Sequence, residues 1–172
     1  ANMELIATIP EFNLYESFWK IFTNSDNQPP QYSGPNAVIK KSIVSEGCEI
    51  YGEVYNSVIG PDVVVEEGAV VKDSIIMKNS HIGKGCLLER CILDENCKLG
   101  QNVKIGLGDN VPNETKPKIY NTGITVLGES SVVPDNVEIG KNCVIYGKTY
   151  PEDYPDGKLE SGKSVLSEEG SL

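Results

Sequence analysis

Few residues of this chain have side chains that could do chemistry: one histidine, five cysteines and some adjacent carboxylates. His81 could serve as a general base, since imidazole exchanges its proton near neutral pH. Thiolates can attack electrophiles or bind zinc, but the cysteines contain no CxxC pair: Cys48, Cys86, Cys91, Cys97 and Cys143. No partner for a base follows from the spacing. We therefore predict no catalytic, cofactor-binding or metal-binding residue here.

Glycine-rich strings and paired acids do not change that prediction. The glycines of IGKG and LGDN are expected to be corner residues of a structural repeat, and neither string is a P-loop or a GxGxxG motif opening a helix. Adjacent acids such as Glu66–Glu67, Glu152–Asp153 and Glu168–Glu169 are expected to solvate the surface. These residues fit structural positions better than a phosphate cradle or an acid–base pair.

Most of the residues discussed above lie within a regular repeat of aliphatic residues, which determines where they are placed in the fold. Steps of six and five separate the aliphatic residues Ile59, Val65, Val71, Ile76, Ile82, Leu88, Leu93, Leu99 and Ile105. Neither a helix nor a single strand has this period. A triangular prism with three short strands per turn has this period, if each aliphatic residue points inward and stacks on its counterpart in the next coil. The chain is therefore predicted to be all-β, a left-handed parallel β-helix built from hexapeptide repeats.

The corners of the prism support this interpretation. Three residues after most aliphatic positions stands a residue that tolerates positive φ: Asp62, Gly68, Asn79, Gly85, Asn96 and Asn102. Ser74 and Cys91 are the exceptions, and both fall in five-residue steps. A small residue follows each corner, and this assigns Cys48, Cys86, Cys97 and Cys143 to one inward structural position. Cys91 is expected off that lattice, in a stacked row with Ser42, Ser57 and Ser74.

His81 directly precedes inward Ile82, so alternation along the strand places it on the outer surface. Hexapeptide acyltransferases commonly use a histidine base at a subunit interface. The alternative is a solvated surface histidine, which we favour here.

The repeat divides the chain into three parts. Residues 1–36 form a linker segment rich in aromatic residues, which either caps the prism or meets another domain. Residues 37–147 form the β-helix, with a loop insertion at 107–126 that breaks the repeat. Residues 148–172 are expected to be an irregular cap and a frayed tail.

Composition excludes several kinds of partner. Lys+Arg 15 against Asp+Glu 25 gives a net charge of −10, which repels nucleic acid and anionic lipid. No apolar run approaches the roughly 18 residues of a membrane span, and no targeting signal is seen. We expect no nucleic-acid or membrane partner, and a cytoplasmic protein with reduced thiols.

The sequence also resembles a known family. The opening ANMELI, then FNLYESFWKIFT, PPQY, GEVYNSVIG, VVKDSIIM and PKIYNTGITVLGESSVVPDNVEIGKN resemble bacterial glucose-1-phosphate adenylyltransferase (ADP-glucose pyrophosphorylase). The likeness covers nearly the whole chain. The repeats alone are shared with many acyltransferases, whereas the linker and the PKIYNTGITV strand are more specific.

The resemblance implies the C-terminal assembly and allosteric-regulatory domain of a nucleotidyltransferase. The parent enzyme would make ADP-glucose and pyrophosphate from ATP and glucose 1-phosphate for glycogen synthesis, with Mg and ATP held in a catalytic domain absent from this chain. This fragment alone is expected to be inactive and without cofactor. Its implied partners are its own N-terminal catalytic domain and other subunits of a homo-oligomer, a tetramer in the family.

One departure from the family concerns regulation. Strongly regulated relatives carry a basic residue just after the GI-V-T-V-type strand, suited to an anionic effector. Gly128 and Glu129 stand there instead. A weak or absent response to sugar phosphates is therefore expected.

Two alternatives remain open. The chain could be a free-standing acyltransferase using acetyl-CoA, with His81 at a trimer interface. It could also be the β-helix of another sugar-phosphate nucleotidyltransferase, because substrate choice would reside in the missing domain.

Overall fold

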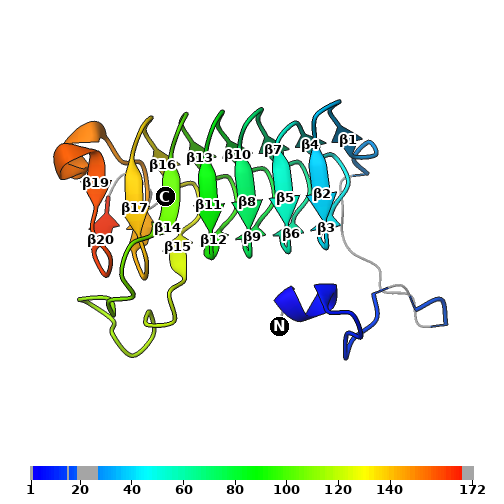
Figure 1. Cartoon of the computed structure of the whole chain (residues 1–172), viewed down its shortest axis with the longest axis horizontal. Helices are drawn as coiled ribbons and strands as arrows, with labels where there is room; N and C mark the ends of the chain where they lie inside the picture. The colour runs from blue at the N-terminus through cyan, green and yellow to red at the C-terminus, as the bar shows by residue number, and fades with distance from the viewer. Residues whose placement is uncertain (1, 15, 19–26, 168–172) are drawn as a thin grey trace.

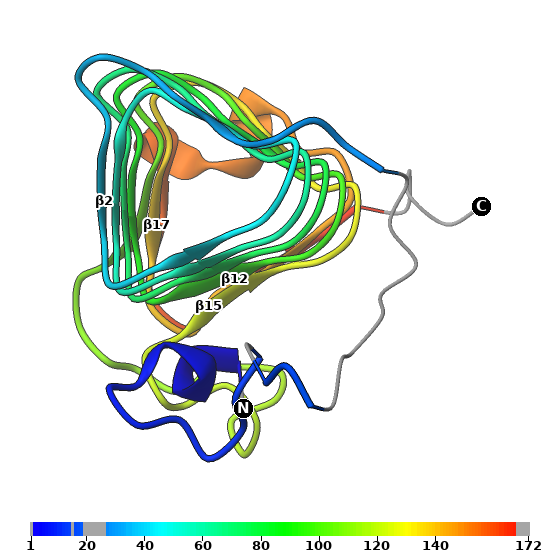
Figure 2. The same ribbon diagram turned by 90° about the vertical axis from the view of Figure 1, so that its right-hand side faces the viewer.

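A computed structural model of the chain shows a triangular β-helix whose coils stack along one axis (Figure 1). It describes residues 2–14, 16–18 and 27–167. Viewed along the axis from its N-terminal end, successive strands run counterclockwise as they recede, which makes the helix left-handed (Figure 2). The predicted fold class is confirmed.

Three parallel sheets form the walls of the prism over the described residues. Sheet A contains β1 (Tyr32–Ser33), β4 (Glu49–Ile50), β7 (Val64–Val65), β10 (His81–Ile82), β13 (Lys98–Leu99) and β16 (Val132–Val133). Sheet B contains β2 (Val38–Lys40), β5 (Glu53–Tyr55), β8 (Val70–Lys72), β11 (Leu87–Glu89), β14 (Lys104–Leu107), β17 (Glu138–Gly140) and β19 (Lys158–Leu159). Sheet C contains β3 (Ile43–Val44), β6 (Val58–Ile59), β9 (Ile75–Ile76), β12 (Cys91–Leu93), β15 (Thr125–Leu127), β18 (Val144–Tyr146) and β20 (Ser164–Leu166).

Helical structure among the described residues is short. It comprises the 3₁₀ turns η1 (Asn2–Ile6), η2 (Pro151–Asp153) and η3 (Pro155–Gly157). No helix in the described part of the chain has the length and apolar character to cross a membrane.

The repeat aliphatic residues fill the interior of the prism. Ile59, Ile76 and Leu93 pair in register on successive strands of sheet C and are at most 1% exposed. Each therefore packs on its counterpart one coil away, as the spacing predicted. Because a coil contacts only its neighbours, the core is a one-dimensional stack.

The corner pattern holds when it is counted back from the following aliphatic residue. A positive-φ residue stands three positions before it and a small buried residue two positions before it, as with Asn96 and Cys97 before Leu99. In the five-residue steps the positive φ falls on Asp73 and Arg90 rather than on Ser74 and Cys91. In these two steps one residue is therefore missing before the corner. The corner keeps the same spacing to the inward residue of the next strand.

The expected stacked row of Ser42, Ser57, Ser74 and Cys91 is confirmed, because each backbone nitrogen after the first donates to the hydroxyl one coil earlier. The expectation that Cys91 lies apart from the other cysteines is wrong. Cys91 has the same position relative to Leu93 as Cys143 has relative to Ile145, and both are buried. Thr125 pairs with Cys91 in the parallel ladder and accepts a hydrogen bond from the Cys143 backbone nitrogen at 3.3 Å. Cys91 and Cys143 therefore share one corner row. Cys91 falls out of the pattern only when positions are counted from the preceding strand, because the step from Leu88 to Leu93 has five residues.

The solenoid extends beyond the expected bounds at both ends. β1 lies within the expected linker of residues 1–36 and pairs with β4. β19 and β20 lie within the expected cap of residues 148–172 and pair with β17 and β18. Between β18 and β19, η2 and η3 form the irregular part of that segment. The expected loop at 107–126 also begins and ends inside strands, because Leu107 closes β14 and Thr125 opens β15.

Candidate functional site

The outer face of sheet C carries a continuous ladder of half-buried aliphatic side chains, which we call the sheet C ladder. Its members precede the inward residues in successive strands and pair with one another in register: Ile43, Val58, Ile75, Ile92, Val126 and Val144. The equivalent outer rows of the other two walls are interrupted by charged or polar side chains, including Glu49, His81 and Lys98 on sheet A and Glu53, Lys104 and Glu138 on sheet B. Sheet C is thus the apolar wall of the prism.

Two segments outside the prism lie beside this wall. The N-terminal turn η1 contacts β6, and the loop of residues 108–124 descends next to β15 (Figures 1 and 2). A hollow of about 690 Å³ lies where η1 meets the wall and is lined by Asn2, Val58, Ile75 and Met77 among others. The centre of the sheet C ladder therefore lies between two flanking segments.

Large apolar side chains of the N-terminal segment and of the loop are also exposed. In the N-terminal segment Phe12 is 51% exposed and Phe18 is 96% exposed, and in the loop Ile119 is 63% exposed. Exposed large apolar side chains are candidates for contact with a partner. The expected aromatic cluster also includes Tyr15, Trp19, Ile21 and Phe22, which lie outside the described residues.

His81 lies on the outer face of sheet A, as alternation predicted. Its side chain is 45% exposed, and Nε2 lies 3.2 Å from Glu66 Oε1 in the preceding coil. Sequence spacing did not reveal this carboxylate, because the pairing depends on the register between coils. Neither the hollow beside η1 nor the groove at Leu107 and Leu159 is lined by His81.

The five cysteines are free and buried. Burial raises the pKa of the Cys91 and Cys97 thiols to about 12, and that of Cys86 and Cys143 to about 11. The thiols therefore stay protonated and act as small apolar groups with weak donors; Cys97 Sγ, for example, donates to Gly128 O at 3.3 Å.

The described part of the chain contains no set of residues suited to bind a metal ion or a phosphate group. No group of three or more His, Cys, Asp or Glu residues there could hold a metal ion. The glycines of IGKG are corner residues: Gly85 has φ of +70°, and Gly83 packs directly against the backbone of Gly100. Their backbone is occupied by coil stacking, so they do not form a phosphate cradle.

The corner after β15 is acidic. Glu129 is exposed there, and the next residue, Ser130, donates its backbone N–H to Glu95 O at 2.8 Å. Lys78 lies one coil before Glu95, toward the N-terminus, and its Nζ is 3.2 Å from Glu95 Oε2, so its charge is already paired. The departure noted in the sequence is therefore an exposed carboxylate, at a corner that stacks on the corner of Glu95.

Over the described residues, three parallel sheets around an interior filled by side chains, with one apolar outer wall, define a hexapeptide β-helix domain. The family described as "GlmU-like, C-terminal hexapeptide" matches residues 30–127. The chain belongs to this family.

Curated relatives extend the similarity to nearly the whole chain. The chain is 64% identical over 166 residues to a glucose-1-phosphate adenylyltransferase of Lachnospira eligens, covering 96% of this chain and 39% of the relative. The enzyme of that name from Acetivibrio thermocellus is 51% identical over 96% of this chain and 39% of its own length. That from Thermotoga neapolitana is 54% identical over 98% of this chain and 40% of its own length. The chain thus spans about two fifths of the curated relatives it matches.

Solved structures are more distant. A perosamine N-acetyltransferase from Caulobacter crescentus, in complex with CoA and GDP-perosamine, is 17% identical, with a TM-score of 0.36 over 81% of this chain and 51% of its own. An Arabidopsis UDP-N-acetylglucosamine acyltransferase is 16% identical, with a TM-score of 0.31 over 81% of this chain and 70% of its own. Matches at this level do not bear on function.

Sequence reasoning did not identify the sheet C ladder, although the signal was present. The doublets Ile43–Val44, Val58–Ile59, Ile75–Ile76 and Ile92–Leu93 each place one aliphatic residue inward and one outward. Only the parallel register shows that the outward members form one column.

Proposed function

We propose that this chain is the assembly and allosteric-regulatory domain of a glucose-1-phosphate adenylyltransferase. The parent enzyme would convert ATP and glucose 1-phosphate to ADP-glucose and pyrophosphate for glycogen synthesis. The observation that carries this is the 64% identity to a protein of that name across 96% of this chain. The relatives have about three fifths of their length outside the match, which leaves room for a catalytic domain.

The sheet C ladder is proposed as the surface on which that catalytic domain docks. A half-buried aliphatic column between two flanking segments would gain free energy by being covered. The exposed side chains of Phe12 and Phe18 in the N-terminal segment would be buried by the same partner. Further subunits of a homo-oligomer are proposed partners as well; no nucleic acid or membrane is expected.

The chemistry would belong to the docked domain. ATP and Mg would bind there, since the described residues of this chain offer neither a phosphate cradle nor a metal cluster. The isolated chain is accordingly proposed to be inactive and without cofactor. Five free, buried cysteines accord with the reducing cytoplasm, which is the proposed location.

The test is the pyrophosphate-dependent formation of ATP from ADP-glucose by the full-length protein that contains this segment. GDP-mannose, with formation of GTP, serves as the parallel substrate. Activity on ADP-glucose alone is expected. Activity on GDP-mannose, or on neither substrate, would overturn the proposed reaction while leaving the β-helix intact. Transfer from acetyl-CoA by the isolated chain would instead support the acyltransferase alternative.

A further inference from the structure

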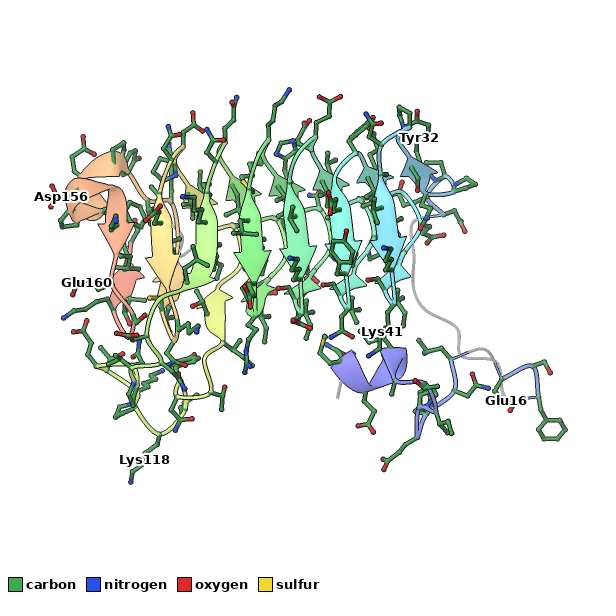
Figure 3. All side chains as sticks on the ribbon, viewed as in Figure 1. Glu16, Tyr32, Lys41, Lys118, Asp156 and Glu160 are labelled. Carbon is green, nitrogen blue, oxygen red and sulfur yellow. The ribbon has the colours of Figure 1, made fainter. Side chains whose placement is uncertain are left out.

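The loop of residues 108–124 is attached to the coil formed by residues 158–167, the last coil that the structure describes. We call this the closing coil; it contains β19 and β20. In Figure 3 Lys118 marks the outer end of the loop, and Glu160 lies on the closing coil above it. The two segments are far apart in sequence, and their contacts are specific.

A buried amide anchors the loop. Asn113 is 1% exposed, and its Nδ2 donates to Asn142 O at 3.0 Å and to Ser164 Oγ of the closing coil at 3.1 Å. Its Oδ1 accepts from the backbone nitrogens of Thr115 and Lys116, each at 3.0 Å. One side chain therefore joins the turn of the loop to the closing coil.

Backbone and charge contacts act beside this anchor. Glu114 N donates to Gly162 O at 2.8 Å, and Glu114 Oε2 is 2.7 Å from Lys163 Nζ. Gly162 has φ of +81°, and a Cβ there would lie 2.6 Å from Pro112 O. The closing coil thus needs a glycine at this point both for its backbone angle and for its close approach to the loop.

A second buried amide ties both ends of the loop to the preceding corner. Asn142 is 0% exposed; its Oδ1 accepts from Gly123 N at 2.7 Å, and its Nδ2 donates to Asn110 Oδ1 and to Val111 O, each at 2.7 Å. Asn142 directly precedes Cys143 and β18, to which the closing coil pairs. The loop is therefore held by the coil before the closing coil as well as by the closing coil itself.

We propose that the closing coil is a latch for the loop, so that residues 108–124 and 158–167 open and close as one unit. Two physical facts support this. Among the described coils the closing coil pairs with a neighbouring coil on one side only, so it opens at lower free energy than central coils. Opening would leave the Asn113 amide without Ser164 and Glu114 N without Gly162 O, and unsatisfied groups of this kind are costly.

Coupling of this kind is reciprocal. Whatever holds the loop closed must protect the closing coil by the same free energy, and loosening the closing coil must loosen the loop. If the two segments were adjacent but not coupled, loosening one of them would leave hydrogen exchange in the other unchanged. A contact that holds the outer end of the loop would therefore also stabilise the closing coil.

The test is amide hydrogen exchange of the 172-residue chain in three forms: unchanged, Val165→Ala and Val44→Ala. Both valines occupy the inward position of an end strand of sheet C and pack partly buried against the core, Val165 in β20 and Val44 in β3. Removal of two methyl groups from a packed site loosens the coil that loses them. Val165→Ala is expected to raise exchange about tenfold in residues 158–167 and equally in 108–124, a change of about 1.4 kcal/mol. Val44→Ala is expected to leave the loop unchanged.

The reciprocal variant is Asn113→Ala, which acts from the loop side. It is expected to raise exchange in β19 and β20 while β9 to β12 keep their protection. Unchanged exchange in the closing coil of Asn113→Ala, or in the loop of Val165→Ala, would overturn the latch. Equal opening of the loop by Val44→Ala would also overturn it, since the effect would then be a general loss of stability.

Discussion

His81 and Ile82 are neighbours in β10 that face opposite sides of the prism wall. Ile82 is 0% exposed and pairs in register with Val65 and Leu99 in the adjacent coils. His81 is nearly half exposed and lies 3.2 Å from Glu66 Oε1. Two adjacent positions therefore have opposite tolerance to substitution.

Ile82→Asp is expected to destabilise the chain by roughly 3–5 kcal/mol, since it places an unpaired carboxylate among aliphatic side chains. His81→Ala is expected to change stability by about 0.5 kcal/mol or less, because it removes only an exposed side chain. Thermal unfolding of the two variants checks both values. Equal melting temperatures would contradict the assigned facing of β10.

The buried thiols make the chain sensitive to alkali. Burial raises the pKa of Cys91 from 9.0 to about 12, so the folded state keeps the proton that the unfolded state loses. This contribution to stability is complete below pH 9 and is lost as the pH rises toward 12. We expect the free energy of unfolding to fall across that range.

Cys91→Ser is the matched variant for the thiol prediction. The Cys91 backbone N–H already bonds Ser74 Oγ at 3.2 Å in the same row, so a hydroxyl suits this position. The variant should fold and lose stability less steeply between pH 9 and 12 than the unchanged chain. Denaturant unfolding at several pH values measures this, and identical slopes for the two proteins would count against the assignment.

The sheet C ladder predicts a loss of docking without a loss of folding. Ile92→Glu changes an outward, half-buried side chain, so the cost in stability should be about 1 kcal/mol or less. In the full-length enzyme it should loosen the catalytic domain, seen as faster proteolysis between the domains. Leu87→Glu, at the outward position of sheet B, is the control and should leave that rate unchanged. Equal proteolysis rates for the two variants, or a change only in oligomeric state, would argue against docking of the catalytic domain on the sheet C ladder.

The acidic corner after β15 predicts weak activation by anions. Fructose 1,6-bisphosphate should change the activity of the full-length enzyme by less than the roughly fivefold at which ordinary allosteric coupling begins. Glu129→Lys should increase the response, since it removes a carboxylate and adds a cation at an exposed position. Glu129→Gln separates the two effects. Large activation of the unchanged enzyme would refute the prediction.

The fold could be predicted because its period is local. Each inward residue, such as Ile76 or Leu93, repeats an environment that six residues of sequence define. The corner phase was harder: Asp73 and Arg90 carry the positive φ of the short steps, although neither is glycine or asparagine. Their position becomes clear only when the count starts from the strand that follows.

The surfaces between coils could not be predicted in the same way. His81 meets Glu66 across fifteen residues, and Asn113 meets Ser164 across fifty-one. Such pairs depend on register and on the path of the loop, which no local pattern encodes. The strands β19 and β20 were also missed, because η2 and η3 interrupt the repeat before it resumes.

The constant phase of the corners also makes the length of the domain adjustable. Ile59, Ile76 and Leu93 stand seventeen residues apart, and each occupies the same place in its coil. Duplication of one such seventeen-residue unit would add a rung of about 4.8 Å and leave every existing side chain facing as before. The distance between η1 and the loop is thus set in whole rungs, so the span of the apolar wall can be changed by gene duplication, one rung at a time.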